Sequence, residues 1–175
     1  NAVQMYLSTV NFNSPNNEAY KRTLEECKSM LDQSINTVSD LAFDLLPKSL
    51  EEGYLGEALE GLTEKLNPFC EFNYTCQMNS ELKKNKQVII YRIFQEFIHN
   101  SMKYVPQSLI TIKISESVGK LNFSLSDNGI GFDFQHIKKG NGIHNIKTRL
   151  KAINADFDYN SSSENGTHLE FTVSI

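Results

Sequence analysis

Hydrophobic residues in the first quarter of the chain recur every three or four positions, which predicts helices. A short stripe covers Val3–Val10, Asn13–Asn16 reads as a turn, and a long helix is expected from about Asn17 to Leu46. The long helix carries a seam made of Leu24, Cys27, Leu31, Ile35, Val38, Leu41 and Leu45. Such a seam is typical of helical bundles. Because two helices cannot enclose it, we expect a second copy to complete a dimeric four-helix bundle, with packing against the rest of the chain as the alternative.

The pattern changes at Pro47, which is expected to end the long helix. Leu50–Gly53 reads as a connector, and Tyr54–Leu66 reads as a further helix that stops before Pro68. We therefore place a domain boundary near residue 50. It separates dimerisation helices (residues 1–50) from a second domain (residues 51–175).

Strands are predicted where apolar and polar residues alternate. The strongest alternations are at Cys70–Cys76, Ile110–Ile114, Leu121–Leu125 and Leu169–Ile175, with a weaker one at Phe157–Tyr159. Two helices are expected between them, Lys84–Tyr104 and Gly142–Ile153. The longer has as buried candidates Val88, Ile89, Ile93, Phe97 and Met102. The second domain is therefore expected to be α+β, a mostly antiparallel sheet with helices on one face in a two-layer α/β sandwich.

Charge and composition narrow the function. The net charge is −4 and the pI is near 5.6, which argues against nucleic acid as a main partner. No apolar run approaches the roughly 20 residues that span a bilayer. The three cysteines, Cys27, Cys70 and Cys76, lack metal-ligand spacing and suggest reduced thiols. We therefore expect a cytoplasmic domain.

Three short stretches carry candidate chemistry, and the first lies within the helix at Gln95–Tyr104. Glu96, Asn100 and Lys103 are spaced four and three residues apart, so their side chains share one helix face. Carboxylate and amide oxygens suit Mg²⁺, and the Lys103 amine suits a phosphate oxygen. A solvated polar helix face is the alternative.

The second stretch, Asp127–Phe132, follows a predicted strand. An ionised carboxylate only accepts hydrogen bonds, so Asp127 suits the exocyclic amine of adenine and would reject the carbonyl of guanine. Gly129 and Gly131 permit close backbone approach. A plain Asn-Gly turn is the alternative.

The third stretch, Gly140–Ile143, precedes a helix, where bare backbone N–H groups can hold an anion. Asp133–Lys139 would then form a short lid. The stretch is not a P-loop, because Gly-Lys-Ser/Thr is absent, and it is not a dinucleotide-binding fingerprint. Together the three stretches suit a purine nucleotide, its Mg²⁺ and its phosphates.

At these residues the chain resembles the ATP-binding domain of bacterial sensor histidine kinases, which have the Bergerat fold of gyrase B, Hsp90 and MutL. The helix from Gln95 resembles the N box of this family, and Asp127–Phe132 and Gly140–Ile143 resemble its two glycine boxes. The variant in the N box is similar to that of the nitrate-sensor and desaturase-sensor subfamily. The resemblance extends over nearly the whole chain.

The resemblance implies ATP and Mg²⁺ as cofactors, a homodimer, and a response regulator as partner. It also implies that the cytoplasmic domain is either free or the cytoplasmic part of a membrane sensor. It implies that Asn100 holds Mg²⁺ with help from Glu96, and that Lys103 and Tyr104 contact phosphate or ribose. Asp127 would bind adenine together with Thr167. The residues implied to shape the pocket and lid are Gly129, Gly131, Gly140, Gly142 and Ile143.

One departure concerns the phosphoacceptor. Sensor histidine kinases phosphorylate a histidine on the first bundle helix, whereas the four histidines here are His99, His136, His144 and His168. Asn1–Gln4 resembles the residues just after the acceptor of the subfamily. We therefore expect a fragment that binds Mg-ATP without phosphorylating itself. The alternatives are a Bergerat-fold ATPase, an anti-sigma serine kinase, or a non-catalytic nucleotide-sensing dimerisation module.

Overall fold

The computed structural model describes residues 22, 25–27, 29–30, 46–104, 109–131, 141–162 and 165–175, without the side chains of residues 103, 104 and 141. The chain divides between Leu45 and Leu46. Apart from six helical positions, the predicted seam from residue 17 to residue 46 lies outside the described residues. The dimerisation hairpin and the boundary near residue 50 therefore stay predictions.

Two helices open the unit that begins at Leu46. Helix α3 spans Lys48–Glu52 and helix α4 spans Leu55–Leu66. The predicted connector at Leu50–Gly53 is wrong, because its residues form most of α3. Pro47 occupies the N-cap of α3, and Gly53 ends it in the left-handed region at a φ of 99°. Residues that suggested a linker thus bracket a short helix, which buries Leu50.

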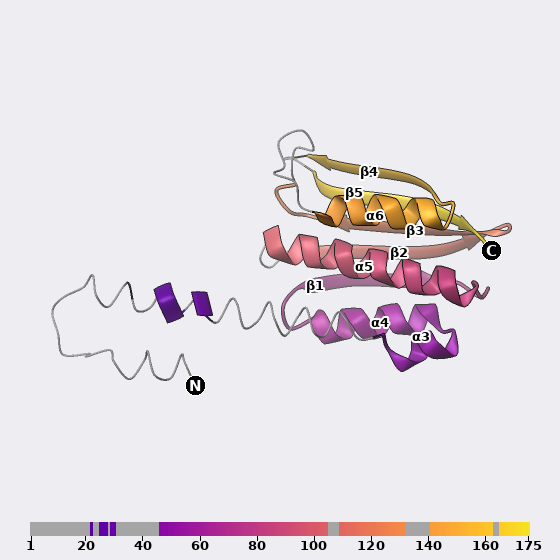
Figure 1. Ribbon diagram of the computed structural model, residues 1–175, viewed down its shortest axis with the longest axis horizontal. Helices are drawn as coiled ribbons and strands as arrows, with labels where there is room; N and C mark the ends of the chain where they lie inside the picture. Colours follow the sequence, from indigo (N-terminus) through magenta and orange to yellow (C-terminus); the bar gives the residue numbers. More distant parts are fainter. Residues whose placement is uncertain are drawn as a thin grey trace. The chain divides into compact units, whose positions relative to one another are not determined.

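The sheet has five strands in the order β1-β2-β3-β5-β4 (Figure 1). The strands are β1 (Glu71–Gln77), β2 (Leu109–Ser117), β3 (Lys120–Asp127), β4 (Asp156–Ser162) and β5 (Gly166–Ser174). β1 pairs with β2 in parallel, and every other pairing is antiparallel. The mostly antiparallel sheet expected from the alternation is confirmed.

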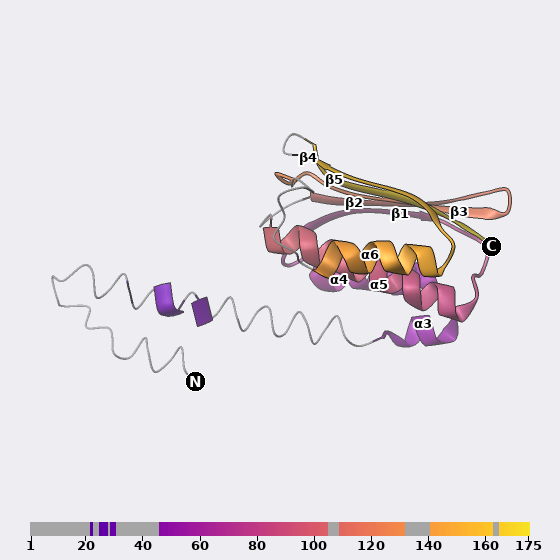
Figure 2. The ribbon, with the colours of Figure 1, turned by 45° about the horizontal axis from the view of Figure 1, so that its top comes forward.

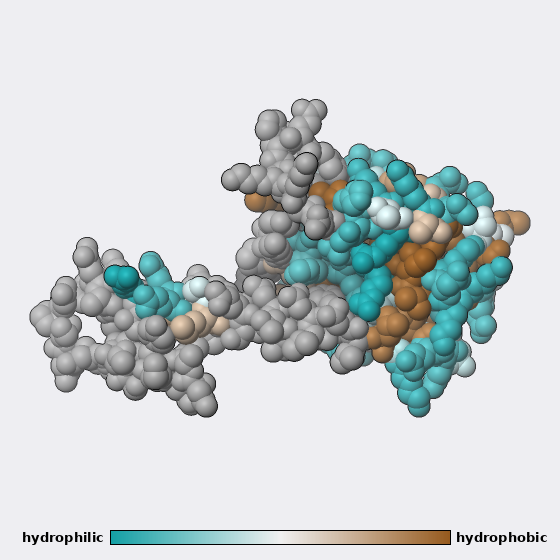
Figure 3. Space-filling model, viewed as in Figure 1, coloured by the Kyte–Doolittle hydropathy of each residue, from teal (hydrophilic) through white to brown (hydrophobic). Residues whose placement is uncertain are grey.

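Helices α4, α5 (Lys84–Tyr104) and α6 (Asn141–Ala152) all cover the same face of the sheet (Figure 2). The α+β two-layer sandwich is therefore confirmed. Seen from the helical side, apolar surface forms a band that polar residues flank (Figure 3). The other face of the sheet is lined by polar residues that include Thr111, Lys113, Ser124, His168 and Glu170. A sheet with one buried and one solvated face explains the alternation in its strands.

The inner face of the sheet is built in rows that cross the central strands. One row joins Phe123, Phe171 and Phe157, and the next joins Leu125, Leu169 and Tyr159. Because side chains alternate along a strand, the following inward row begins at Asp127. The inner face therefore changes along the strands from a row of phenylalanines, through a row of two leucines and Tyr159, to a polar row.

Helix α5 is held to this face by an aromatic cluster. The ring of Phe94 meets Phe123 edge-on at 6.0 Å and Phe171 edge-on at 6.4 Å. Phe123 and Phe171 stack with their centroids 4.6 Å apart. All three side chains are nearly inaccessible to solvent. This cluster sets which face of α5 lies on the sheet.

The buried face of α5 is only partly the expected one. Ile93 and Phe97 are buried as predicted, and so are Ile90, Phe94 and Ile98. The other three candidates, Val88, Ile89 and Met102, are half-buried. The sheet takes one face of α5 while α4 and α6 contact it from the sides, so the apolar residues around the helix differ in burial.

No helix within the described ranges is long and apolar enough to cross a lipid bilayer.

Truncating the aromatic cluster should destabilise this unit strongly. We expect Phe94→Ala to lower the free energy of unfolding by about 3 to 5 kcal/mol, since it leaves a cavity between α5 and the sheet. Urea unfolding followed by circular dichroism measures the change. Val118→Ala, at a fully exposed turn position, is the control and should change stability by less than about 0.5 kcal/mol. Equal effects of the two substitutions would contradict this account of the core.

Candidate functional site

Asp127 is the last residue of β3, and its side chain is buried. Three donors surround the carboxylate. Oδ1 accepts hydrogen bonds from the backbone N–H of Gly129 at 2.9 Å and of Thr167 at 3.2 Å. Oδ2 accepts one from the Ser101 hydroxyl at 2.8 Å. Residues of α5, of the turn after β3 and of β5 thus all orient this one carboxylate.

The hydrogen bonds to Asp127 leave acceptor capacity. A carboxylate offers about four lone-pair sites, and the protein fills three of them, two at Oδ1 and one at Oδ2. The remaining site at Oδ2 suits a donor from outside the protein, such as an exocyclic amine. The expected role of Asp127 toward adenine stays a prediction.

Ser101 was not among the predicted site residues, although its position could have been inferred from residue spacing. Ser101 follows Phe94 by seven residues, or two helical turns, and therefore shares its sheet-facing side. Asp127 follows Phe123 by four residues on the inward face of β3. Because Phe94 packs on Phe123, the helix and the strand meet again at Ser101 and Asp127.

Hydroxyl groups extend the polar row from Asp127. The Thr167 hydroxyl lies 3.3 Å from the hydroxyl of Ser161, its partner on β4. Gly166 packs so closely on Asp127 that an added Cβ would collide with the Asp127 carbonyl oxygen. Gly131 makes a similar close approach to the carbonyl of Ser162. These approaches bring the turn after β3 against the ends of β4 and β5.

A second polar cluster forms where α5 meets the start of α6. A Cβ built on Gly142 would lie 2.5 Å from Glu96 Oε1 and 2.9 to 3.0 Å from the two terminal atoms of Asn100. Both side chains therefore point at the first turn of α6, as their shared helix face predicts. The backbone of Gly142 can come this close only because it carries no side chain.

Two buried polar atoms in this cluster make no hydrogen bond, Asn100 Nδ2 and Arg149 Nη1. Arg149 Nη1 lies 3.6 Å from Glu96 Oε2, which is an ion pair but is too long for a good hydrogen bond. Buried polar groups in folded proteins are almost always satisfied, and exceptions mark places where water or a ligand binds. The carboxylate and amide oxygens here are of the kind that Mg²⁺ takes together with waters and phosphate oxygens.

Tyr159 lies close enough to both clusters to respond to their charges. Burial is the main cause that raises the pKa of its phenol, and the carboxylates of Asp127 and Glu96 raise it further. The Lys147 ammonium lies 6.0 Å from the centroid of its ring. Tyr159 thus stays neutral at physiological pH. Nothing in the sequence distinguished it from an ordinary inward-facing strand residue.

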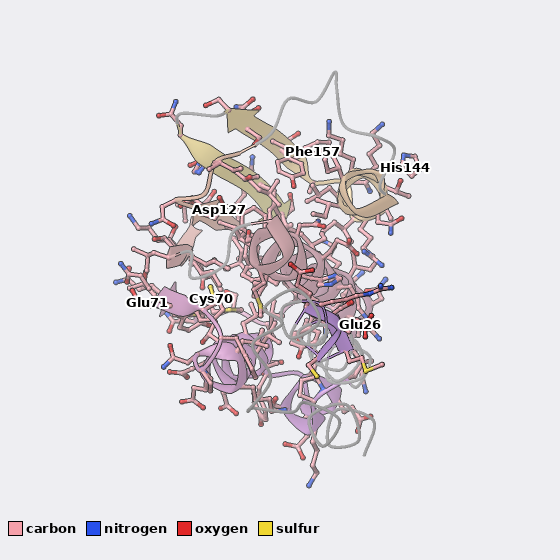
Figure 4. The ribbon with its side chains drawn as sticks, turned by 90° about the vertical axis from the view of Figure 1, so that its left-hand side faces the viewer. Glu26, Cys70, Glu71, Asp127, His144 and Phe157 are labelled. Carbon is pink, nitrogen blue, oxygen red and sulfur yellow. The ribbon has the colours of Figure 1, made fainter. Side chains whose placement is uncertain are left out.

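The structure describes the side chains of only some of the predicted site residues. Figure 4 views the molecule from the end of the sheet at which Asp127 lies and shows His144 on α6 at the same end. The half-buried Ile143 lies in the first turn of α6. Lys103 and Tyr104 end α5, but their side chains lie outside the described residues, as does Gly140 with the predicted lid.

The close approach at Gly166 can be tested against Gly119, a glycine of similar backbone conformation. The two residues have φ of 67° and 70°, but a Cβ on Gly119 would meet nothing within 4 Å. We expect Gly119→Ala to lower the free energy of unfolding by about 1 to 2 kcal/mol through backbone strain alone. Gly166→Ala should lower it by at least about 3 kcal/mol, because the backbone of Asp127 must also move. Equal losses in urea unfolding would show that the contact is unimportant.

Comparisons with known proteins identify the family of the chain. Residues 85–175, more than half of the chain, match the family described as histidine kinase-, DNA gyrase B- and HSP90-like ATPase. The matched segment contains α5 from its second residue on, together with Asp127, Gly142 and Thr167, so it includes residues of both polar clusters.

Two curated relatives are sensor kinases. The oxygen sensor histidine kinase NreB of Staphylococcus carnosus is 23% identical over 153 residues, which cover 85% of this chain and 44% of the relative. The sensor histidine kinase YdfH of Bacillus subtilis is 28% identical over 168 residues, which cover 91% of this chain and 41% of the relative. The chain thus spans less than half the length of these relatives.

A solved structure has the same fold. The histidine kinase domain of the Erythrobacter litoralis EL346 blue-light activated histidine kinase aligns with a TM-score of 0.59 at 15% identity, covering 69% of this chain and 60% of that one. The chain therefore belongs to the family of histidine kinase-, DNA gyrase B- and HSP90-like ATPases, and its homologues are sensor histidine kinases.

Proposed function

We propose that this chain binds Mg-ATP between its two polar clusters and is the kinase portion of a two-component sensor. In this proposal the γ-phosphoryl group passes to a histidine on a dimerisation helix. The main support is the buried Asp127 carboxylate, which three protein donors orient and which keeps one acceptor position open. A fixed acceptor of this kind matches the amine of adenine.

The same carboxylate explains a preference for adenine over guanine. Guanine carries a carbonyl where adenine carries its amine, so two acceptors would face each other at Oδ2. A site built around one hydrogen-bonding partner discriminates strongly against an analogue that leaves its buried groups unpaired. Thr167 would join the same network through its hydroxyl, with Ser161 beside it.

The cluster at the start of α6 would hold the phosphate end. Asn100 and Glu96 would bind Mg²⁺ together with phosphate oxygens, and the metal would neutralise charge that develops on the transferred group. The backbone at Gly142 would face the phosphates. We propose that Lys103 and Tyr104 contact phosphate or ribose, as their place at the end of α5 allows. The protein then contributes positioning and charge stabilisation rather than covalent chemistry.

The acceptor is proposed to be a histidine other than those the structure describes. His99 is half-buried within α5, His144 lies on α6, and His168 lies on the open face of the sheet, where it pairs with Glu170. None belongs to a bundle helix. Residues 1–50 would form the dimerisation helices, a second copy would complete them, and a response regulator would receive the phosphoryl group. This cytoplasmic portion would work in a larger sensor.

Nucleotide binding is the first test. We expect Asp127→Asn to weaken binding of an ATP analogue roughly 10- to 100-fold, since the amide presents a donor to the adenine amine. Asn100→Ala should remove most of the gain in affinity that Mg²⁺ provides. Isothermal titration with and without Mg²⁺ measures both effects. Asp156→Asn, at an exposed position of β4, is the matched control and should bind like the unaltered chain. Binding that neither site substitution changes would favour a non-catalytic scaffold.

Phosphoryl transfer is tested separately. The chain incubated with γ-labelled ATP and Mg²⁺ should acquire no acid-labile phosphate, because none of the four histidines of the sequence lies in residues 1–50, the proposed dimerisation helices. Labelling of any of the four, His99, His136, His144 or His168, would refute the assignment of the acceptor. Steady ATP turnover that Glu96→Ala abolishes would instead favour hydrolysis, with Glu96 activating water.

A further inference from the structure

Arg149 is a residue that neither the motifs nor the comparisons single out. Three cations lie in the second half of α6, namely Lys147, Arg149 and Lys151, and Arg149 makes an ion pair with α5 through Glu96. We propose that Arg149 is a positioning residue that orients the Glu96 carboxylate toward the metal and phosphate end of the site. The inference rests on the proposed function, because it deepens the role given there to Glu96.

The geometry around Glu96 supports this role. Oε1 faces the backbone at Gly142, and Oε2 lies 3.6 Å from Arg149 Nη1. Gly142 and Arg149 are seven residues apart, so two turns of one helix face present both groups. Long side chains on a helix lean toward its N-terminus, which lets Arg149 reach back along α6. Two positions of one helix, α6, therefore flank the Glu96 carboxylate.

Partial burial strengthens the ion pair between Arg149 and Glu96. The side chains of Arg149 and Glu96 are 33% and 22% exposed, so solvent screens their attraction less than it would on an open surface. Arg149 Nη1 itself is buried and lacks an acceptor. A buried unsatisfied donor is unfavourable, so this nitrogen favours orientations of Glu96 that keep Oε2 near it. Oε1 then remains directed at the start of α6, where Asn100 also points.

The alternative role for Arg149 is that of a direct phosphate ligand, since guanidinium groups also bind phosphate. The two roles differ in one respect. A positioning residue acts through Glu96, so its removal has no further effect once Glu96 cannot bind a metal. A phosphate ligand acts whether or not Glu96 is present. A double-mutant cycle separates them.

The test uses the full chain with adenylyl imidodiphosphate in isothermal titration, in Mg²⁺ and in excess chelator. We expect Arg149→Met to weaken Mg²⁺-dependent binding about 3- to 10-fold, the size of a typical pair coupling. Binding in chelator should not change. Arg149→Lys should recover part of the loss, because the charge is kept. In the Glu96→Gln background, Arg149→Met should have no further effect. Lys151→Met, an exposed position on the same helix, is the charge-matched control.

Thermal unfolding without ligand separates a coupling between the two residues from a general loss of folding. Arg149→Met and Glu96→Gln should each lower the melting temperature by a few degrees, and the double variant should lose less than their sum. The proposal is overturned if Arg149→Met binds like the unaltered chain. It is also overturned if the loss is equal in chelator and persists in Glu96→Gln, which would indicate direct phosphate contact. Failure of the unaltered chain to bind the analogue would instead refute the proposed function.

Discussion

The packing of α5 across the inner face of the sheet is the constraint on which the rest of the site depends. Phe94 sits against the stacked rings of Phe123 and Phe171, and this cluster sets the rotation of the helix. Two turns further along, the same rotation brings Ser101 to Asp127. It also leaves Glu96 and Asn100 on the side that faces α6. One hydrophobic contact therefore positions polar groups at both ends of the proposed nucleotide site.

One polar cluster lies at Asp127, where the inner face of the sheet becomes polar, and the other lies where α5 meets the start of α6. At Asp127 the protein supplies three donors to one carboxylate, so a charged group can be buried at acceptable energetic cost. At the start of α6 the opposite holds, because Asn100 Nδ2 and Arg149 Nη1 are buried without a hydrogen bond. The first arrangement orients an acceptor in advance. The second leaves the Asn100 Nδ2 donor for a bound water or phosphate oxygen, while Arg149 stays paired with Glu96.

Much of this arrangement was predictable from local patterns. The bounds of α5, the inward face of β3 and the shared face of Glu96 and Asn100 follow from spacings of two, three and four residues. The short helix α3 was not predicted, because Pro47 and Gly53 cap one helix turn as readily as they flank a linker. Ser101, Arg149 and Tyr159 were also missed. The role of each residue depends on an interaction with a residue at least 26 positions away. Spacing along the chain carries no information about such an interaction.

The sequence alone determined the type of each element and the chemistry available on its faces, because helices and strands repeat over short distances and their side chains inherit that period. Only the tertiary structure decided which of those faces meet. Asp127 became an oriented acceptor when β5 and α5 supplied donors to it, and Glu96 became bracketed when α6 packed on α5. The physical reason is that hydrogen bonds and ion pairs act over a few ångströms in space, whereas residue patterns describe only neighbours along the chain.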